Sequence, residues 1–159
     1  MAQWSVLDRF DLQLLNLVQK DDSRTADELA ETIALSPSAI ARRLRRLRGE
    51  GWITHTIALL ADRLTERRLR ALVFIELAEH ADHQGKAALE TRLRSADEIQ
   101  FCYETTGDCD LLALIDCASM AKFNAFCDTV LVADPTVRRY ETSFIKREVK
   151  FAPFVNLAD

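Results

Sequence analysis

The stretch Thr25–Ile53 constrains the fold of this chain most strongly, because it predicts two short helices joined by a tight turn. Thr25 and Glu28 have the spacing of a capping box, which marks the start of a helix. Ser36 and Pro37 mark the start of the next helix. Ser36 can accept a free backbone N–H, and proline loses no hydrogen bond at the first helical position. This combination predicts a helix-turn-helix.

The second of these helices carries arginines on its outward side. Ile40, Leu44 and Leu47 recur at helical spacing and form its buried stripe. A step of about 100° per residue from Ile40 places small and basic residues on the far side and the flanks. They are Ser38, Ala39, Arg42, Arg43, Arg45, Arg46 and Arg48. No acidic residue lies between Ser36 and Arg48, so the charges are not paired along the helix.

This charge pattern suits a helix that enters a DNA groove, although a solvated surface helix would carry similar charges. Small residues at the start of the helix allow close approach to base edges, and arginine binds both guanine and phosphate. The residues that we expect to contact bases are Ser38, Ala39, Arg42 and Arg46. The residues that we expect to contact phosphates are Thr25, Ser36, Arg43, Arg45 and Arg48.

The composition limits the other functions open to the chain. Its 159 residues include 21 basic and 25 acidic side chains, a net charge of −4, so positive charge that serves DNA binding must be local. No segment is long and apolar enough to span a membrane, and the N-terminus lacks the apolar core of a signal peptide, so we expect a cytoplasmic protein. The four cysteines contain no C-x-x-C pair and the three histidines are dispersed, which predicts neither a metal site nor a cofactor.

The rest of the N-terminal part predicts a unit of three helices with a wing. Asp8 and Asp11 are expected to cap a first helix. Its apolar side consists of Phe10, Leu14, Leu15, Leu17 and Val18. Gly49 and Gly51 are expected to supply the left-handed backbone that ends the arginine-bearing helix. Trp52–Leu59 then alternates between apolar and polar residues and predicts the short strand of a wing.

Beyond a charged linker, Asp62–Arg70, the pattern becomes that of a small α+β domain. The predicted strands are Leu72–Leu77, Ile99–Tyr103, Leu111–Ile115 and Val137–Val149. The first predicted helix is Asp82–Arg94. The second begins after its cap, Ser119, and ends at Asp134-Pro135. The residues of this second helix expected to point inward are Met120, Phe123, Phe126, Cys127 and Val130. The order β-α-β-β-α-β is that of the ferredoxin-like fold.

The third predicted strand is apolar on both faces of the sheet. Leu111, Ala113 and Ile115 point one way, and Leu112 and Leu114 point the other. Helices cover only one face of this fold, and a bare apolar face is a liability in a monomer. We therefore expect this face to pack against a second copy of the chain. Such a dimer would place two arginine-bearing helices on one DNA, about one helical turn or a multiple apart.

Four motifs follow one another along the chain. They are L-D-R-F-D-L-Q-L-L at Leu7–Leu15, L-S-P-S-A-I-A-R-R-L-R-R-L at Leu35–Leu47, G-W-I at Gly51–Ile53 and T-G-D-C-D at Thr106–Asp110. In this order and spacing they resemble the Lrp/AsnC (feast/famine) family of transcriptional regulators.

The resemblance implies a winged helix-turn-helix DNA-binding domain at residues 1–60, a linker at 61–69 and a ferredoxin-like effector-binding and oligomerisation domain at 70–159. It also implies that the partners are double-stranded DNA, a small-molecule effector such as an amino acid, and further copies of the chain. Homodimers in this family commonly assemble further, often to octamers.

The resemblance further implies that the effector pocket forms around the turn Thr106-Gly107-Asp108-Cys109-Asp110. Gly107 permits close backbone approach and a positive φ, backbone N–H groups of the turn can bind a carboxylate, and Asp108 or Asp110 can bind an ammonium. The alternative is an ordinary tight turn between two strands. Cys109 stands where an aromatic residue is common in the family, and a redox-sensing role for its thiol is a separate hypothesis.

Two other functions are compatible with the same fold. Sirohaem decarboxylases resemble these regulators but carry histidine and arginine near the second strand, where this chain has Phe101-Cys102-Tyr103-Glu104. His80 and His83 fall before or at the start of a helix, and no nucleophile–base pair is visible, so we expect no enzyme activity. The other function is that of a DNA-architectural protein that needs no effector.

Overall fold

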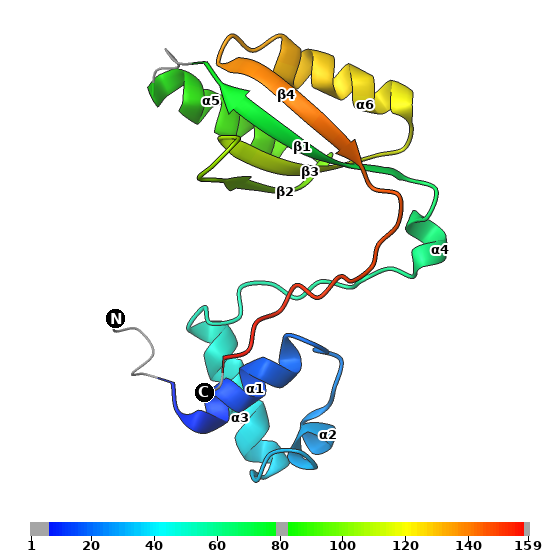
Figure 1. Ribbon diagram of the computed structural model, residues 1–159. Helices are drawn as coiled ribbons and strands as arrows, with labels where there is room; N and C mark the ends of the chain where they lie inside the picture. Colours follow the sequence, from blue (N-terminus) through cyan, green and yellow to red (C-terminus); the bar gives the residue numbers. More distant parts are fainter. Residues whose placement is uncertain (1–6, 79–82, 158–159) are drawn as a thin grey trace. The chain divides into compact units, whose positions relative to one another are not determined.

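The computed structural model describes residues 7–78 and 83–157, which divide into two compact units (Figure 1). The first unit holds the described residues up to Leu59 together with those from Lys150, and the second is Leu60–Val149. The predicted helix start at Asp82 and the residue His80 lie outside the described residues. No helix in the described part of the chain is long and apolar enough to cross a membrane.

The N-terminal unit contains the helices α1 (Arg9–Val18), α2 (Ala26–Ala30) and α3 (Pro37–Gly49). Asp8, Thr25 and Ser36 cap their N-termini, as predicted. Asp8 and Thr25 form reciprocal capping boxes with Asp11 and Glu28. Each cap satisfies backbone N–H groups that helix geometry leaves free, so neighbours in the sequence are enough to set these helix starts.

Apolar side chains from these helices form the core of the N-terminal unit. Leu14, Leu29, Ile40 and Leu47 are fully buried, and Leu44 completes the predicted stripe of α3. Burying one leucine or isoleucine side chain contributes about 1.5–3 kcal/mol relative to leaving it exposed. The stability of this small unit therefore depends on a few large side chains.

The wing strand predicted at Trp52–Leu59 is wrong, since this segment contains no strand within the described residues. Trp52 and Ile53 pack against the core of the unit, whereas Ile57 and Leu59 are exposed. An alternating sequence becomes a strand only where a neighbouring strand takes up its backbone hydrogen bonds. Among the described segments, none pairs with this one.

The end of α3 also differs in part from its prediction. Gly49 is the last residue of the helix and does not have a positive φ, whereas Gly51 has a φ of 78°. One left-handed residue is enough to turn the chain away from the helix axis. Only Gly51 therefore has the role that was predicted for both glycines.

The last described residues of the chain belong to the N-terminal unit, although the sequence placed them in the C-terminal domain. The Gln19 side chain donates to the Val155 carbonyl at 2.5 Å and accepts from the Val155 N–H at 3.1 Å. The Asn16 side chain accepts from the Leu157 N–H at 2.9 Å. Leu157 packs against the apolar core of the same unit. Polar side chains of α1 and its C-terminal end thus hold the end of the chain.

The second unit contains α4 (Asp62–Thr65), β1 (Leu69–Leu77), α5 (His83–Ser95), β2 (Ile99–Glu104), β3 (Leu111–Cys117), α6 (Met120–Cys127) and β4 (Val137–Phe144), with a π-helical turn Asp128–Val132 after α6. Its strands form a four-stranded antiparallel sheet in the order β2-β3-β1-β4. The predicted ferredoxin-like architecture is therefore confirmed. Ser119 caps α6 as predicted, and α5 and α6 cover one face of the sheet (Figure 1).

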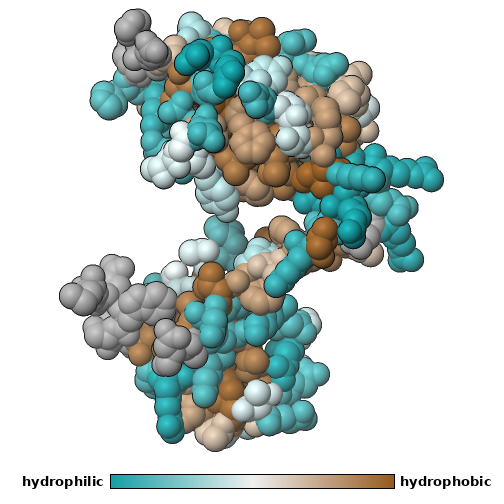
Figure 2. Space-filling model, viewed as in Figure 1, coloured by the Kyte–Doolittle hydropathy of each residue, from teal (hydrophilic) through white to brown (hydrophobic). Residues whose placement is uncertain are grey.

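The two faces of this sheet lie in different environments. The residues that face the helices are fully buried and include Ala71, Val73, Ile75, Ala113 and Ile115. The strand register aligns six apolar residues on the opposite side, which we call the open sheet face. They are Leu72, Phe74, Phe101, Tyr103, Leu112 and Leu114. The rings of Phe101 and Tyr103 stack with their centroids 5.0 Å apart, and Figure 2 shows apolar residues gathered over the strands of this unit.

Two predictions for the second unit are wrong in detail. Met120 does not point inward, since it is 46% exposed. The last strand ends at Phe144 and not at Val149. The N–H of Ile145 still donates to the carbonyl of Arg70 at 2.8 Å, but β1 itself begins at Leu69 and offers no further partners. A strand on the edge of a sheet extends only as far as its neighbour does.

Candidate functional site

The outward line of α3, which we define as Ser38, Arg42 and Arg45, is exposed along its length. These residues follow one another at helical spacing on the side opposite the buried stripe. Within the described residues, the side chains of Arg42 and Arg45 form neither an ion pair nor a hydrogen bond. The hydroxyl of Ser38 lies 3.2 Å from that of Ser36. Two guanidinium groups one turn apart are thus available to a partner outside the chain.

The arginines on the α1 side of α3 are held by acidic residues. Arg43 Nη1 lies 2.8 Å from Asp8 Oδ2 and 2.8 Å from Asp11 Oδ1, and Arg46 Nη2 lies 2.6 Å from Asp11 Oδ2. The Asp11 side chain is 1% exposed and also accepts the N–H of Asp8 at 3.1 Å. A buried carboxylate needs partners of this kind. The hydrogen bonds to Asp11, and then to Asp8, raise the pKa of Arg43 above its ordinary value.

Arg48 is paired on the other flank of α3. Its Nη2 lies 2.7 Å from Asp22 Oδ1, and the second oxygen of Asp22 accepts the hydroxyl of Thr56 at 2.7 Å. The absence of acidic residues along α3 therefore does not mean that its arginines are unpaired. The acids are the N-cap of α1 (Asp8), a residue of α1 itself (Asp11) and a residue of the turn that follows it (Asp22). The sequence contains these acids, but only the packing of the helices brings them to the arginines.

The remaining predicted contact residues lie at helix starts. Thr25 Oγ1 donates to Glu28 Oε2 at 2.9 Å and accepts from the Glu28 N–H at 3.2 Å. Ser36 Oγ accepts from the Ala39 N–H at 3.3 Å. Thr25 and Ser36 are exposed, and Ala39 is half-buried. Both hydroxyls already act as helix caps. A phosphate at the start of α3 could in addition accept hydrogen bonds from backbone N–H groups of that helix.

The predicted effector turn is tied firmly to the sheet at one end. Asp110 Oδ2 accepts the N–H of Leu77 at 2.8 Å, and the N–H of Asp110 donates to the carbonyl of Ile75 at 2.9 Å. Its carboxylate thus holds the turn against the end of β1. This structural task competes with the predicted role of Asp110 in binding an ammonium.

The tip of the same turn is open. Thr106, Gly107 and Asp108 are exposed, and Gly107 has a φ of 144°, which favours glycine. Cys109 is half-buried, with its Sγ 3.3 Å from the hydroxyl of Thr105. The side chain of Asp108 forms no hydrogen bond within the described residues, so it remains available to a ligand.

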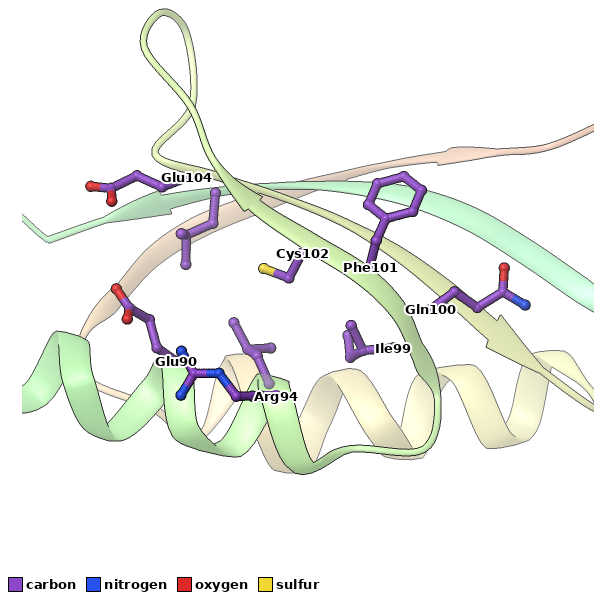
Figure 3. Close-up of a pocket in the computed structure, with 9 residues that line it drawn as sticks. Glu90, Arg94, Ile99, Gln100, Phe101, Cys102 and Glu104 are labelled. Carbon is purple, nitrogen blue, oxygen red and sulfur yellow. The ribbon is translucent and has the colours of Figure 1, made fainter. Parts of the chain in front are cut away.

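A cavity of about 360 Å³ lies between α5 and β2 (Figure 3). Its apolar lining comes from Leu93, Ile99, Cys102 and Leu111, and its charged lining includes Glu90 and Arg94 of α5. Glu104 also lines the cavity and lies at the end of β2, two positions before Thr106 of the effector turn. The sequence did not indicate this cavity, because its residues belong to segments that look like ordinary parts of a helix and a strand.

Three of the four thiols of this unit, those of Cys102, Cys117 and Cys127, belong to its apolar core or pack against it. Burial raises the pKa of Cys102, of Cys117 and of Cys127, the last to about 11. A thiol with such a pKa is neutral near pH 7 and packs as a small apolar side chain. Among the residues that the structure describes, no group of three or more histidine, cysteine or acidic side chains is arranged to hold a metal ion.

Comparisons with known proteins match both units of the chain. The family model for the Lrp/AsnC ligand binding domain matches residues 70–153, and that for a winged helix-turn-helix DNA-binding domain matches residues 7–54. The leucine-responsive regulatory protein of Escherichia coli is 31% identical over 144 residues, which cover 91% of this chain and 87% of that protein. An HTH-type transcriptional regulator of Haemophilus influenzae is 30% identical over 145 residues, which cover 91% of this chain and 85% of that protein.

Solved structures give the same result for the fold. A transcriptional regulator of Neisseria meningitidis, crystallised as a complex with L-Met, has a TM-score of 0.82 at 27% identity and covers 92% of this chain and 94% of its own. AsnC of Escherichia coli has a TM-score of 0.76 at 19% identity, with 93% and 97% of the two chains covered. The second likeness concerns the fold alone.

Proposed function

This chain belongs to the Lrp/AsnC family of transcriptional regulators, and from this premise we propose that it binds operator DNA through the outward line of α3 and responds to an amino acid. The single observation that carries the proposal is the pair Arg42 and Arg45, exposed on α3 without an internal partner among the described residues. Residues 1–60 would serve as the DNA-binding domain, 61–69 as a linker and 70–159 as the effector-binding and oligomerisation domain, except that the described residues from Lys150 pack with the first of these.

We assign the contacts to DNA as follows. The residues proposed to contact bases are Ser38, Ala39, Arg42 and Arg46, and those proposed to contact phosphates are Thr25, Ser36, Arg43, Arg45 and Arg48. The internal ion pairs favour Arg42 and Arg45 as the main DNA ligands. Arg43, Arg46 and Arg48 would reach DNA with part of their charge already neutralised, so each should contribute less.

Binding to DNA selected from a random duplex pool tests this assignment. Arg42→Ala should weaken binding to the selected sequence by about 1–3 kcal/mol and lose most of the preference over random DNA, because it removes a base contact. Arg45→Ala should weaken both kinds of DNA alike and lower the slope of log K against log salt by about one. Fluorescence anisotropy at several salt concentrations measures both effects.

Lys122→Ala is the matched control for these variants, because it removes one positive charge from the exposed surface of α6 in the other unit. It should leave both affinities close to those of the wild type. Unchanged binding by Arg42→Ala, by Arg45→Ala and by the double variant would contradict the proposed interface.

The open sheet face supports a homodimer. Its six apolar residues lie together on the side of the sheet that the helices leave bare, and all of them except the buried Leu114 are half-buried or exposed. Contiguous apolar patches of this kind mark protein interfaces in soluble proteins. We propose that a second copy covers this face and that dimers assemble further, up to octamers. A dimer would bring two α3 helices to one operator.

The amino-acid effector follows from the family and from the solved relative that was crystallised with L-Met. We propose that the effector binds at or beside the turn Thr106-Gly107-Asp108-Cys109-Asp110. A ligand that binds only the folded state raises the apparent stability, so a thermal-shift screen of the standard amino acids tests this step. A protein whose melting temperature responds to none of them would instead be a regulator or architectural protein without this effector.

The relatives named above are transcriptional regulators, which supports a role in DNA binding and not in enzyme catalysis. The second strand lacks the histidine and arginine of the sirohaem decarboxylases. We propose that the protein acts in the cytoplasm, without a cofactor. Turnover of sirohaem by the purified protein would contradict the proposal that it is not an enzyme.

A further inference from the structure

The end of the chain makes a second connection between the two units. The residues from Lys150 belong to the first unit, whereas Leu60–Val149 form the second. The chain therefore enters the second unit before β1 and leaves it again after β4. We call the returning segment, Lys150–Leu157, the C-terminal strap. The structure describes all of it, and it contains neither a helix nor a strand. Pro153 further disfavours helical backbone at the residue before it.

Side chains at the end of α1 hold the C-terminal strap on the first unit. Gln19 exchanges two hydrogen bonds with the strap backbone, at 2.5 Å and 3.1 Å, and Asn16 accepts from the N–H of Leu157 at 2.9 Å. The side chain of Leu157 packs against the apolar core of the unit, and Lys20 Nζ lies 5.4 Å from the centroid of the Phe154 ring. Directional hydrogen bonds and an apolar anchor together fix this end of the strap.

On the second unit, the chain is held just before the strap begins. The N–H of Ile145 donates to the carbonyl of Arg70 at 2.8 Å, and Arg70 Nη1 lies 2.9 Å from Glu148 Oε2. Because Arg70 belongs to β1, these contacts hold the chain at the sheet. Six steps along the chain lead from Glu148 to Phe154, which already lies beside Lys20. The strap is thus a short segment held at both ends.

The C-terminal strap is the shorter of the two connections. One residue of extended chain spans at most about 3.3–3.6 Å, so the six steps from Glu148 to Phe154 span at most about 20 Å. In the other connection, Thr56 and Arg68 each form a side-chain hydrogen bond within their own units. The twelve steps between these two residues span at most about 40 Å. The strap therefore sets the upper limit on how far the anchored ends can move apart.

A difference of this size matters on DNA, where half-sites recur with the helical turn. Half-sites one turn apart have their centres about 34–36 Å apart, so about 20 Å of additional reach exceeds half a turn. Half a turn moves a half-site to the opposite side of the duplex. A DNA-binding unit held by the strap would reach half-sites of one phase, whereas a unit held by the linker alone would reach others as well.

We propose that the C-terminal strap sets the spacing between the two half-sites that a dimer binds, with Asn16, Gln19 and Leu157 as positioning residues. This inference rests on the proposed function, in which a dimer brings two α3 helices to one operator. The positioning residues act through the reach of the strap and not through contacts with DNA. A docked strap raises the effective concentration of the second α3 helix at a half-site of the right phase and lowers it at the others.

Binding to duplexes of varied spacing tests the proposal. Each duplex carries two copies of the half-site found in the DNA selected from the random pool. The distance between their centres increases in steps of one base pair over one helical turn. A duplex with a single half-site measures the intrinsic affinity of one DNA-binding unit. For the wild type, fluorescence anisotropy should show binding about tenfold or more weaker when the best spacing is changed by half a turn.

Two variants release the strap in different ways. Asn16→Ala combined with Gln19→Ala removes the hydrogen bonds from α1, and Leu157→Asp removes the apolar anchor without changing α1. In both, the penalty for half a turn should fall to about threefold or less, while the affinity for the single half-site stays within the error of the control. Gln13→Ala is the control, since Gln13 is an exposed glutamine of α1 that forms no side-chain hydrogen bond within the described residues. Circular dichroism and sedimentation equilibrium confirm that each variant is folded and associates like the wild type.

The outcomes separate this inference from the proposed function. A wild type that binds none of the duplexes contradicts both. A wild type that binds them, with the same spacing profile in the released variants, overturns the role of the strap and leaves DNA binding intact. Equal weakening at every spacing and on the single half-site would show that the strap only stabilises the first unit, which also overturns the proposal. A flatter spacing profile with unchanged binding to the single half-site supports it.

Discussion

At the scale of single residues, Asp11 has the most demanding role in the N-terminal unit. Its buried carboxylate accepts from Arg43, from Arg46 and from the N–H of Asp8, so it caps α1 and holds α3 at the same time. Removing one member of such a set leaves the other members without a partner. The same carboxylate also withdraws two arginines from the surface that we propose for DNA.

Asp11→Asn should therefore act on stability and on DNA binding in opposite directions. The free energy of unfolding should fall by about 1–3 kcal/mol, because the charge-assisted bonds to Arg43 and Arg46 are lost. Non-specific DNA binding should become tighter and more dependent on salt, because Arg46 loses the charge of Asp11 and Arg43 keeps only Asp8 as its ionic partner. Urea unfolding and anisotropy titrations measure the two effects. Glu31→Gln is the control, because Glu31 is an exposed acidic residue at the end of α2. An Asp11→Asn protein as stable as this control would contradict the prediction.

The two glycines after the α3 arginines should respond to alanine with opposite signs. Gly49 is helical and has open space where a Cβ would lie, so Gly49→Ala should stabilise the protein by about 0.5–1 kcal/mol. Gly51 also has open space but a φ of 78°, so Gly51→Ala should destabilise it by about 1 kcal/mol or more. Each variant is the control for the other in urea unfolding, and equal effects would show that this backbone assignment is wrong.

At the scale of elements, the helices of the N-terminal unit depend on ionised caps. Burial raises the pKa of Asp8, but hydrogen bonds from the Asp11 N–H and the Arg43 guanidinium outweigh burial and hold this pKa below its ordinary 3.8. Hydrogen bonds from the backbone and then the hydroxyl of Thr25 hold the pKa of Glu28 below its ordinary 4.5. Both carboxylates are thus bound more strongly in the folded helices than in the unfolded chain.

The sign of the resulting pH dependence follows from these shifts. A carboxyl group with a lowered folded pKa contributes stability above its unfolded pKa and loses it as the pH falls through the folded value. The N-terminal unit should therefore become less stable below about pH 4. Circular dichroism melts between neutral and acidic pH measure this loss. Asp8→Asn and Glu28→Gln should each make the dependence shallower, whereas an unchanged profile in the double variant would contradict the role of these caps.

At the scale of the whole molecule, the open sheet face determines whether the chain can act alone. Phe74 and Leu112 lie side by side on this face, in β1 and β3, and both are half-buried in the single chain. A charge introduced there would be buried without a partner in a face-to-face dimer but would stay solvated in a monomer.

Phe74→Glu and Leu112→Glu should therefore yield monomers with native helical content, and their operator affinity should fall because one α3 helix remains for each molecule. Sedimentation equilibrium at micromolar concentration measures the association, and circular dichroism confirms that the variants are folded. Lys122→Glu changes the exposed surface of α6 and should leave the oligomer intact. Variants that associate like the wild type would place the interface elsewhere.

Local signals in the sequence were enough to predict much of this protein. The caps at Asp8, Thr25 and Ser36, the buried stripe of α3 and the β-α-β-β-α-β order all depend on residues a few positions apart, and the structure confirms them. Hydrogen bonds at a helix start and the spacing of apolar residues involve the same short segment in any fold that contains it.

The tertiary structure decided which of these local features remain available for function. Arg43 and Arg46 meet Asp11 across a separation of more than thirty residues, so their pairing depends on how α1 and α3 pack. The strand expected at Trp52–Leu59 has no neighbour to complete it among the described residues, and the cavity beside Arg94 exists only because α5 lies against the edge strand β2. Ion pairs, strand pairing and cavities each require contact between two segments that are distant in the sequence. Local sequence patterns predict the structure of each segment but not the tertiary contact between them.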